Sequence, residues 1–171
     1  MKKLFLYAFL FFCAVLGYGQ NLVPNSGFEI YDTCPSNAGQ IYRTIPWENP
    51  TLASPDYNNS CNGGFWSVPN NVYGTENART GVGYAGIFTC LFPSNNYREY
   101  IQVLLLDSLI FGKKYCVKFY ISLGDSSLYS SNFIGAYFSI GKISNFSSQQ
   151  NFSYVPQIRN DTLNSLAFKN G

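Results

Sequence analysis

The segment 114–123 alternates between apolar and polar side chains with a period of two. In KYCVKFYISL, one face would carry Tyr115, Val117, Phe119, Ile121 and Leu123. Alternate side chains share one side of a β-strand, whereas the apolar face of a helix recurs with a period of about 3.6 residues. The rest of the chain sustains no helical period either. The pattern therefore predicts an all-β fold.

Three further segments have the composition of strands: 81–88, 97–106 and 133–141. Gly83 and Gly86 in the first of them indicate a bulge or a close approach of another backbone. Short strands separated by polar turns, with no helix between them, predict an antiparallel β-sandwich. We expect 114–123 and 133–141 to be central in it. The stretch of about 48–80 is too long for a hairpin turn and is predicted to be a functional or edge-wrapping loop.

The first residues have the layout of a secretory signal peptide over 1–19. Lys2 and Lys3 precede an apolar run, and small residues lie just before Gln20. The run is shorter than the roughly 20 residues that a membrane-spanning helix needs. We therefore expect cleavage, no transmembrane segment in the mature chain, and a secreted or cell-surface (outer-membrane) location.

The remaining residues, 20–171, are predicted to form one β-sandwich domain. Its last part, 156–171, contains no clear final strand. We therefore expect the sandwich to be incomplete at its C-terminal end.

Charge and residue types exclude several classes of function. Without Lys2 and Lys3 the chain has 11 − 2 = 9 basic and 9 acidic residues, so no net positive charge favours nucleic acid. The sequence contains 0 histidines, which excludes the usual Ser–His–Asp and Cys–His catalytic groups. No glycine-rich phosphate loop or paired-carboxylate motif is recognisable. A protein that is not an enzyme is predicted.

The cysteines of the mature chain are Cys34, Cys61, Cys90 and Cys116. Their even number and the predicted export favour disulfides over free thiols. Without histidine or a C-x-x-C pair, a zinc site is disfavoured. Of the three pairings, Cys34–Cys61 with Cys90–Cys116 is favoured, since each bridge would then close one loop. A buried free thiol at Cys116 is the alternative.

Three phrases carry a resemblance to a known family: NLVPNSGFE (21–29), ARTGVGYAGI (78–87) and LIFGKKYCVKFYISL (109–123). Together they resemble the galactose-binding-like jelly-roll domains of carbohydrate-binding modules. The closer likeness is to N-terminal domains of secreted and outer-membrane proteins of the Bacteroidota, which often precede an OmpA-like or sorting domain. The likeness covers about residues 21–140 and includes a middle section with Trp47, Pro50, Thr51, Asp56, Tyr57 and Cys61.

The resemblance implies roles for two residues of the opening phrase. Phe28 would pack inward from a first strand, and Glu29 would help backbone carbonyls to hold a structural calcium ion. Calcium prefers six to eight oxygen ligands, of which one carboxylate supplies only a part. The alternative is that Glu29 caps a turn or forms a surface ion pair. No other cofactor is predicted.

The segment 56–73 combines aromatic and amide side chains. Sugars offer an apolar face and a rim of hydroxyls, so their sites pair a flat ring with hydrogen-bonding groups. The predicted ligand-binding residues are Tyr57, Asn58, Asn62, Trp66 and Tyr73. Alternatively, Trp66 covers the end of the core and the asparagines form turns. Trp47 is expected in the core.

The sequence thus predicts a non-catalytic extracellular or cell-surface module whose partner is a glycan or another cell-surface component. The alternative is a structural or adhesive domain of an OmpA-like secreted or outer-membrane protein, without a sugar site.

Overall fold

The computed structural model describes residues 19–90, 97–127, 134–145 and 152–159. Over these ranges the chain contains no α-helix, and its one helical element is the 3-10 turn η1 (Ile41–Arg43). The strands form two-stranded antiparallel sheets. The predicted all-β class is confirmed. Nearly all of the predicted signal peptide and the last predicted residues, 160–171, lie outside the described ranges.

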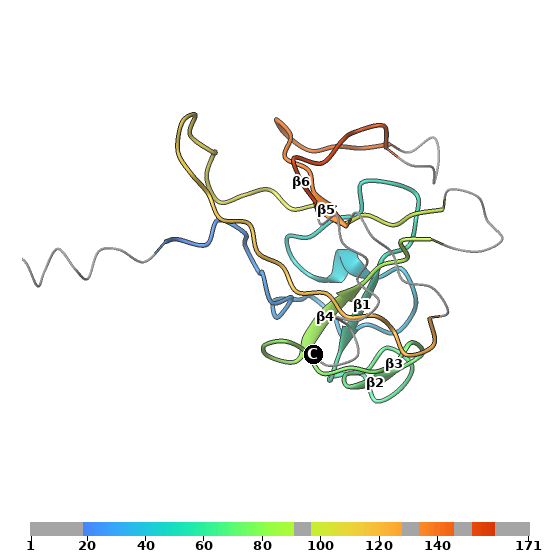
Figure 1. Cartoon of the computed structure of the whole chain (residues 1–171). Helices are drawn as coiled ribbons and strands as arrows, with labels where there is room; N and C mark the ends of the chain where they lie inside the picture. The colour runs from blue at the N-terminus through green and yellow to red at the C-terminus, as the bar shows by residue number, and fades with distance from the viewer. Residues whose placement is uncertain (1–18, 91–96, 128–133, 146–151, 160–171) are drawn as a thin grey trace, which may run out of the picture.

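The centre of the molecule is the pair of β1 (Asp56–Asn59) and β4 (Gly83–Gly86), shown in Figure 1. Asp56 pairs with Gly86 and Asn59 with Gly83. A Cβ atom on Gly83 would lie 3.1 Å from the carbonyl oxygen of Phe28 and 3.0 Å from the Asn59 side chain. The strand predicted around 81–88 therefore exists, and Gly83 marks a close approach of another backbone as its sequence indicated.

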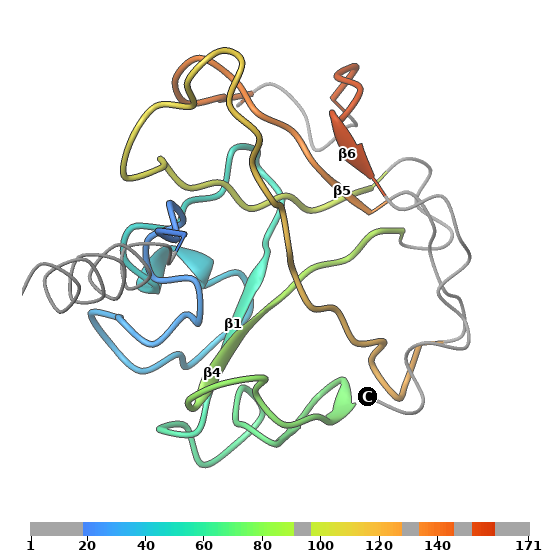
Figure 2. The same ribbon diagram turned by 60° about the vertical axis from the view of Figure 1, so that its left-hand side comes forward.

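Two shorter pairs lie on opposite sides of this centre. The hairpin of β2 (Asn70–Asn71) and β3 (Gly74–Thr75) lies at one end, and the pair of β5 (Gly135–Ala136) and β6 (Ile158–Arg159) lies at the other. Figures 1 and 2 show this arrangement from two directions. The β5–β6 end and the β2–β3 end are therefore separate regions of the surface.

The opening phrase is a tight turn, which corrects the first strand that the resemblance implied. The side chain of Asn25 holds this turn together. Its amide donates to the carbonyls of Ile30 (2.8 Å) and Ile45 (2.9 Å), and its Oδ1 accepts the Ile30 N–H (3.0 Å). A side chain that satisfies the backbone of its own segment competes with strand pairing, as asparagine commonly does. Phe28, with φ of 61°, does pack inward, with its ring centroid 4.9 Å from that of Trp47.

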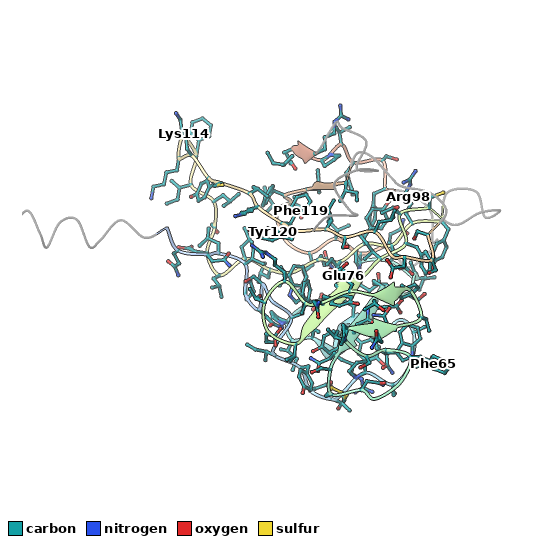
Figure 3. All side chains as sticks on the ribbon, turned by 60° about the horizontal axis from the view of Figure 1, so that its bottom comes forward. Phe65, Glu76, Arg98, Lys114, Phe119 and Tyr120 are labelled. Atoms are coloured by element: carbon teal, nitrogen blue, oxygen red, sulfur yellow. A yellow bond between two sulfur atoms is a disulfide. The ribbon has the colours of Figure 1, made fainter. Side chains whose placement is uncertain are left out.

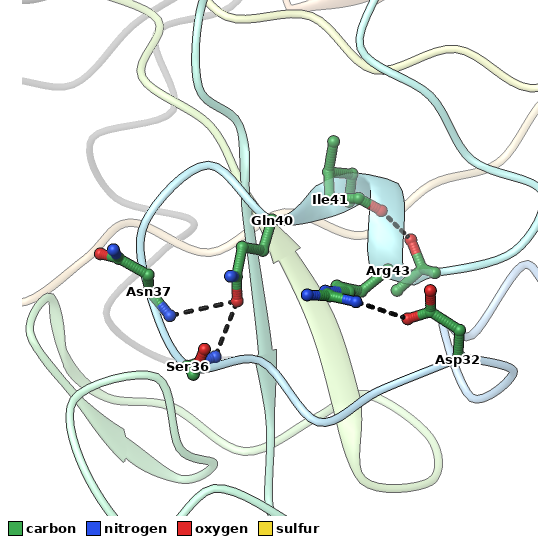
Figure 4. A network of polar contacts seen from close by, with 7 residues as sticks. Asp32, Ser36, Asn37, Gln40, Ile41 and Arg43 are labelled. Atoms are coloured by element: carbon green, nitrogen blue, oxygen red, sulfur yellow. Dashed lines mark hydrogen bonds and ion pairs between the residues drawn. The ribbon is translucent and has the colours of Figure 1, made fainter.

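The chain after this turn is fixed around η1 by side-chain-to-backbone hydrogen bonds (Figure 4). Gln40 accepts the N–H groups of Ser36 (2.7 Å) and Asn37 (3.1 Å) with its side-chain oxygen. At the other end of η1, the Thr44 hydroxyl donates to the Ile41 carbonyl, and both residues are completely buried. The Ile41 N–H also donates to the Pro55 carbonyl (3.1 Å), which holds the segment beside β1.

The predicted bridge between Cys34 and Cys61 is present, with the Cα atoms 5.9 Å apart. It ties the chain before η1 to the end of β1. Cys90 and Cys116 are free and exposed, so the predicted Cys90–Cys116 bridge is not formed and Cys116 is not a buried thiol. Spacing along the chain does not bring two cysteines within the roughly 7 Å that a bridge requires.

The segment 114–123 is not a strand, which corrects the strongest prediction from the sequence. It makes no backbone hydrogen bond to another described residue. Tyr115, Phe119 and Tyr120 are 42%, 42% and 55% exposed, and Figure 3 shows Lys114 at the tip of a projecting part of the chain. Alternation specifies which face a strand would bury, but a strand also needs a neighbour for its backbone groups.

The other strand predictions are met in small part. Of 133–141, only β5 is a strand; residue 133 lies outside the described ranges. Of 97–106, only Gln102 pairs, in an isolated bridge to Glu48. Conversely, β1 lies inside the segment that was predicted to be a loop.

The buried core surrounds β1 and η1, and much of it is polar. Its fully buried large side chains include Tyr57, Ile41, Asn58 and Asn59. Two carboxylates, Asp56 and Glu99, are buried with them. Such a core depends on internal hydrogen bonds as well as on apolar packing.

Candidate functional site

The structure separates the predicted glycan-binding residues into buried and accessible groups. Tyr57 and Asn58 lie in β1 and are 0% exposed. The Tyr57 hydroxyl donates to the Phe28 carbonyl (2.9 Å), and burial raises the pKa of Tyr57 to about 12. Neither side chain reaches solvent, so the prediction that these two contact a ligand is corrected. Both are core residues.

Asn62 belongs to the turn that follows β1. Its side chain donates to the Pro35 carbonyl and accepts the N–H of Gly64. These bonds hold the two ends of the Cys34–Cys61 region together and give the amide a turn-forming role, which was the alternative for the asparagines.

Trp66 and Tyr73 remain as half-buried aromatic residues beside the β2–β3 hairpin. Trp66 forms a bridge with Asn71, and its ring meets that of Tyr73 edge to face, with centroids 6.2 Å apart. Tyr73 in turn meets Phe88 at 5.7 Å. Trp66, Tyr73 and Phe88 are all half-buried, so together they form a short aromatic cluster that is partly accessible. Trp47 packs on Phe28 and donates its indole N–H to the Asn25 carbonyl (2.9 Å). It is half-buried, as Trp66 is, so its expected place in the core is met only in part.

The aromatic cluster adjoins a buried carboxylate that the sequence prediction did not include as a site residue. Asp56 is 2% exposed and accepts hydrogen bonds from the Gly39 N–H (2.6 Å) and the Tyr73 hydroxyl. Burial raises the pKa of Asp56, and the two hydrogen bonds oppose that shift in part. Burial and the bond to Asp56 raise the pKa of Tyr73 as well.

A second buried carboxylate, Glu99, lies near the first. It is 3% exposed and accepts from the N–H groups of Phe88 (2.8 Å) and Ser54 (3.2 Å) and from the Tyr97 hydroxyl (2.9 Å). Burial is the main cause that raises the pKa of Glu99, and the charge of Asp56 adds to it. In the sequence, Glu99 falls on the same face of the predicted 97–106 strand as Ile101, Val103 and Leu105. This alternation is a signal that its side chain points inward.

Asn58 lies on the same face of the β1–β4 pair as Asp56, two residues along the strand. Its side-chain oxygen and nitrogen are both buried without a hydrogen-bond partner among the described residues. The orphan amide and the two carboxylates are closed off from solvent, so this polar cluster does not reach a substrate. We interpret it as a structural feature of the core.

Glu29 has the turn-capping role that was the alternative to calcium. Its carboxylate accepts the N–H of Val82 (3.0 Å) and of Gly83 (3.2 Å), directly at the start of β4. These two N–H groups use part of the acceptor capacity of the carboxylate. The calcium role that the resemblance implied stays a prediction, and we derive nothing from it. Among the described residues, no group of three or more Cys, Asp or Glu side chains is placed to hold a metal.

A second aromatic surface, which the sequence prediction missed, lies beside β5 and β6. Tyr137 and Tyr154 stack with their ring centroids 4.9 Å apart and their planes inclined by 16°. They line a shallow hollow. The two tyrosines are distant in sequence and lie outside any motif, so only the fold brings them together.

Comparisons with known proteins found no matching family model, no matching curated protein and no matching solved structure. In the part of the chain that the structure describes, no helix has the length and apolarity needed to cross a bilayer. What the fold and the geometry define is therefore a class, a disulfide-bridged all-β module with two partly exposed aromatic surfaces.

Proposed function

We propose that this chain is a non-catalytic extracellular or cell-surface module that binds glycans. The observation that carries the proposal is the Trp66 ring, partly exposed and held edge to face against Tyr73. A fixed flat ring beside polar groups suits the apolar face and the hydroxyl rim of a sugar. The side chain of the neighbouring Asn71 is already engaged: its amide donates to the Ser67 carbonyl (3.1 Å) and the Tyr84 hydroxyl, and its oxygen accepts the Tyr73 N–H (2.9 Å). A sugar could use only the remaining acceptor capacity of that oxygen.

The compartment follows from two features. The Cys34–Cys61 bridge favours an oxidising environment, and the basic-then-apolar start of the chain is typical of exported proteins. A catalytic role has little support, because the buried carboxylates Asp56 and Glu99 are almost inaccessible.

The finer fold assignment, a galactose-binding-like jelly roll as in carbohydrate-binding modules, belongs to the same proposal. Antiparallel pairing throughout the described strands is compatible with it. Its main support is still the three sequence phrases in 21–29, 78–87 and 109–123.

A glycan array with the chain from residue 20 onward tests the function directly. Trp66→Ala should reduce binding while the melting temperature stays close to that of the parent protein. Trp47→Ala is the matched control: it should lower the melting temperature, because Trp47 packs on Phe28 and its indole N–H bonds to the carbonyl of Asn25, which holds the opening turn. An array without any bound glycan would contradict the proposed function.

One observation favours the alternative, a structural or adhesive domain without a sugar site. Large apolar side chains are fully exposed at Phe111 and Ile140 and are 61–62% exposed at Leu104 and Leu106. Exposed apolar surface of this kind is common at protein–protein contacts. Under this alternative the array stays blank and the protein self-associates, which sedimentation velocity would measure.

A further inference from the structure

The hollow beside β5 and β6 has a volume of about 350 Å³. This value lies at the lower end of the range for small-molecule sites, which is about 300–1,000 Å³. Its lining combines two aromatic rings with hydroxyl and amine groups and two isoleucines: Tyr137, Tyr154, Ser139, Ser144, Lys142, Ile140 and Ile143. We propose that this hollow binds a neutral sugar, a mono- or disaccharide unit. The inference rests on the proposed glycan-binding function and gives it a second location.

The aromatic part of the hollow offers a stacking surface. Tyr137 is 40% exposed and Tyr154 is 51% exposed, although the two rings cover part of each other. The aromatic row continues inward from Tyr154 to Phe152 (5.6 Å) and from Phe152 to Tyr100 (4.9 Å). The row restrains the exposed rings, so a ligand need not order them on binding.

The walls of the hollow are fixed by two glutamine side chains that each bond to backbone in both directions. Gln157 accepts the Phe138 N–H (2.8 Å) and donates to the Phe138 carbonyl (3.0 Å). Gln102 accepts the Ile143 N–H (3.0 Å) and donates to the Ile143 carbonyl (2.8 Å). Each glutamine thus replaces the neighbour that a paired strand would supply.

Gly135 in β5 allows β5 and β6, and with them the Tyr137 and Tyr154 rings, to lie close together. A Cβ atom on Gly135 would lie 2.4 Å from the Ile158 carbonyl oxygen, so a larger residue would push β5 away from β6. Tyr137 follows β5 directly and Tyr154 precedes β6. The close pairing of the two strands therefore helps to bring their rings into contact.

Charge decides between neutral and acidic sugars. Lys142 is the cation of the hollow lining, and it forms an ion pair with Glu48. An acidic sugar would have to compete with Glu48 for the amine. A neutral sugar needs only hydroxyl contacts, which the amine and the Ser144 hydroxyl can make. The Ser139 hydroxyl donates to the Gly141 carbonyl (2.7 Å) and can still accept.

The hollow adjoins β5–β6, and the Trp66 ring adjoins β2–β3. These two strand pairs lie at opposite ends of the molecule (Figure 1). Substitutions at the two places therefore separate two sites. The probes are the methyl glycosides of glucose, galactose and mannose, with glucuronic acid as the acidic comparison, together with any glycan that the array identifies.

The experiment measures affinities by NMR titration of the chain from residue 20 onward. Tyr154→Ala should weaken binding of the best neutral probe about tenfold, the loss expected for one well-placed stacking contact of about 1.4 kcal/mol. Ser144→Trp, which fills the hollow from its polar wall and leaves both tyrosines in place, should weaken it as much. The affinity read from the resonances of the residues that line the hollow should be unchanged by Tyr42→Ala, at an exposed tyrosine elsewhere, and by Trp66→Ala, whose effect is expected only at the Trp66 surface.

The outcomes distinguish the inference from the function on which it rests. If a glycan binds and neither Tyr154→Ala nor Ser144→Trp weakens it, the hollow is not the site and the proposed function stands with Trp66. Preference for glucuronic acid over the neutral probes would overturn the assignment to neutral sugars. If no glycan binds the parent protein at all, the inference and the proposed function fail together.

Discussion

The hydroxyl of Tyr73 donates a hydrogen bond to the carboxylate of Asp56, which is buried at the start of β1. The same Tyr73 ring touches both Trp66 and Phe88. One residue thus links the buried polar cluster to the accessible aromatic surface. The geometry of the Trp66 surface therefore depends on a hydrogen bond within the core.

This bond leads to the first prediction, for Tyr73→Phe. The substitution keeps the ring but removes a donor from a buried carboxylate, so the free energy of unfolding should fall by about 1–3 kcal/mol. Urea unfolding at neutral pH measures the change. Tyr42→Phe, which removes an exposed hydroxyl, should leave stability within about 0.5 kcal/mol. Equal effects of the two substitutions would show that the Asp56 bond does not stabilise the fold.

The second prediction concerns pH. Burial raises the pKa of Asp56 above its ordinary 3.8 and the pKa of Glu99 above its ordinary 4.5. The folded state therefore binds protons more tightly than the unfolded state. The stability from these two groups is greatest below their ordinary pKa values and is lost as the pH rises through the folded values.

Glu99→Gln tests this dependence. Unfolding free energies of the parent and the variant, measured between about pH 4 and about pH 7, should show a parent curve that falls more steeply over the window above 4.5. Asp107→Asn, at an exposed carboxylate, is the control and should follow the parent. A Glu99→Gln curve parallel to the parent curve would contradict the prediction.

The residues of β1 show where prediction from sequence failed. Asp56–Asn59 has polar side chains and turn-forming residue types, so the segment was predicted as loop. Pairing with β4 and burial of Tyr57 make it the central strand, which is a tertiary effect that local preference does not contain. In the opposite case, 114–123 has the pattern of a strand and lacks a described partner for it.

The features that sequence did predict are those set by local chemistry. Gly83 was identified because a glycine in a strand pattern indicates a close backbone approach. The Cys34–Cys61 bridge was preferred because it joins neighbours along the chain in an exported protein. The stacked pair Tyr137–Tyr154 could not be predicted in this way, since the rings meet only through the pairing of β5 with β6.

The third prediction follows from the disulfide. Replacing both Cys34 and Cys61 by serine opens a loop with a sequence separation of 27 and should lower the free energy of unfolding by about 3 kcal/mol in the chain-entropy description. Replacing Cys90 and Cys116 should change it by less than about 0.5 kcal/mol, since both are exposed. A thiol-reactive dye on the folded chain from residue 20 onward should label Cys90 and Cys116 alone. Labelling of Cys34 or Cys61 would contradict the bridge.

The fourth prediction uses the contact between Glu29 and the turn before β4. Gly81 has φ of +66°, and a Cβ atom there would lie 2.2 Å from the Glu29 carboxyl carbon. Gly112 has φ of +79° with nothing within 4 Å of its Cβ position. Alanine at either position should cost about 1 kcal/mol for the left-handed backbone.

Gly81→Ala should cost about 1 kcal/mol more than Gly112→Ala, because relief of the clash moves the Glu29 carboxylate away from the N–H groups of Val82 and Gly83. Urea unfolding in a double-mutant cycle measures the part of the Gly81→Ala cost that comes from the Glu29 carboxylate. In the Glu29→Ala background, Gly81→Ala has no carboxylate left to displace, so its cost should fall to that of Gly112→Ala. If the cost of Gly81→Ala is the same with and without Glu29, the carboxylate does not hold this turn. The entry into β4, against which β1 and the buried carboxylates are arranged, would then depend on the backbone alone.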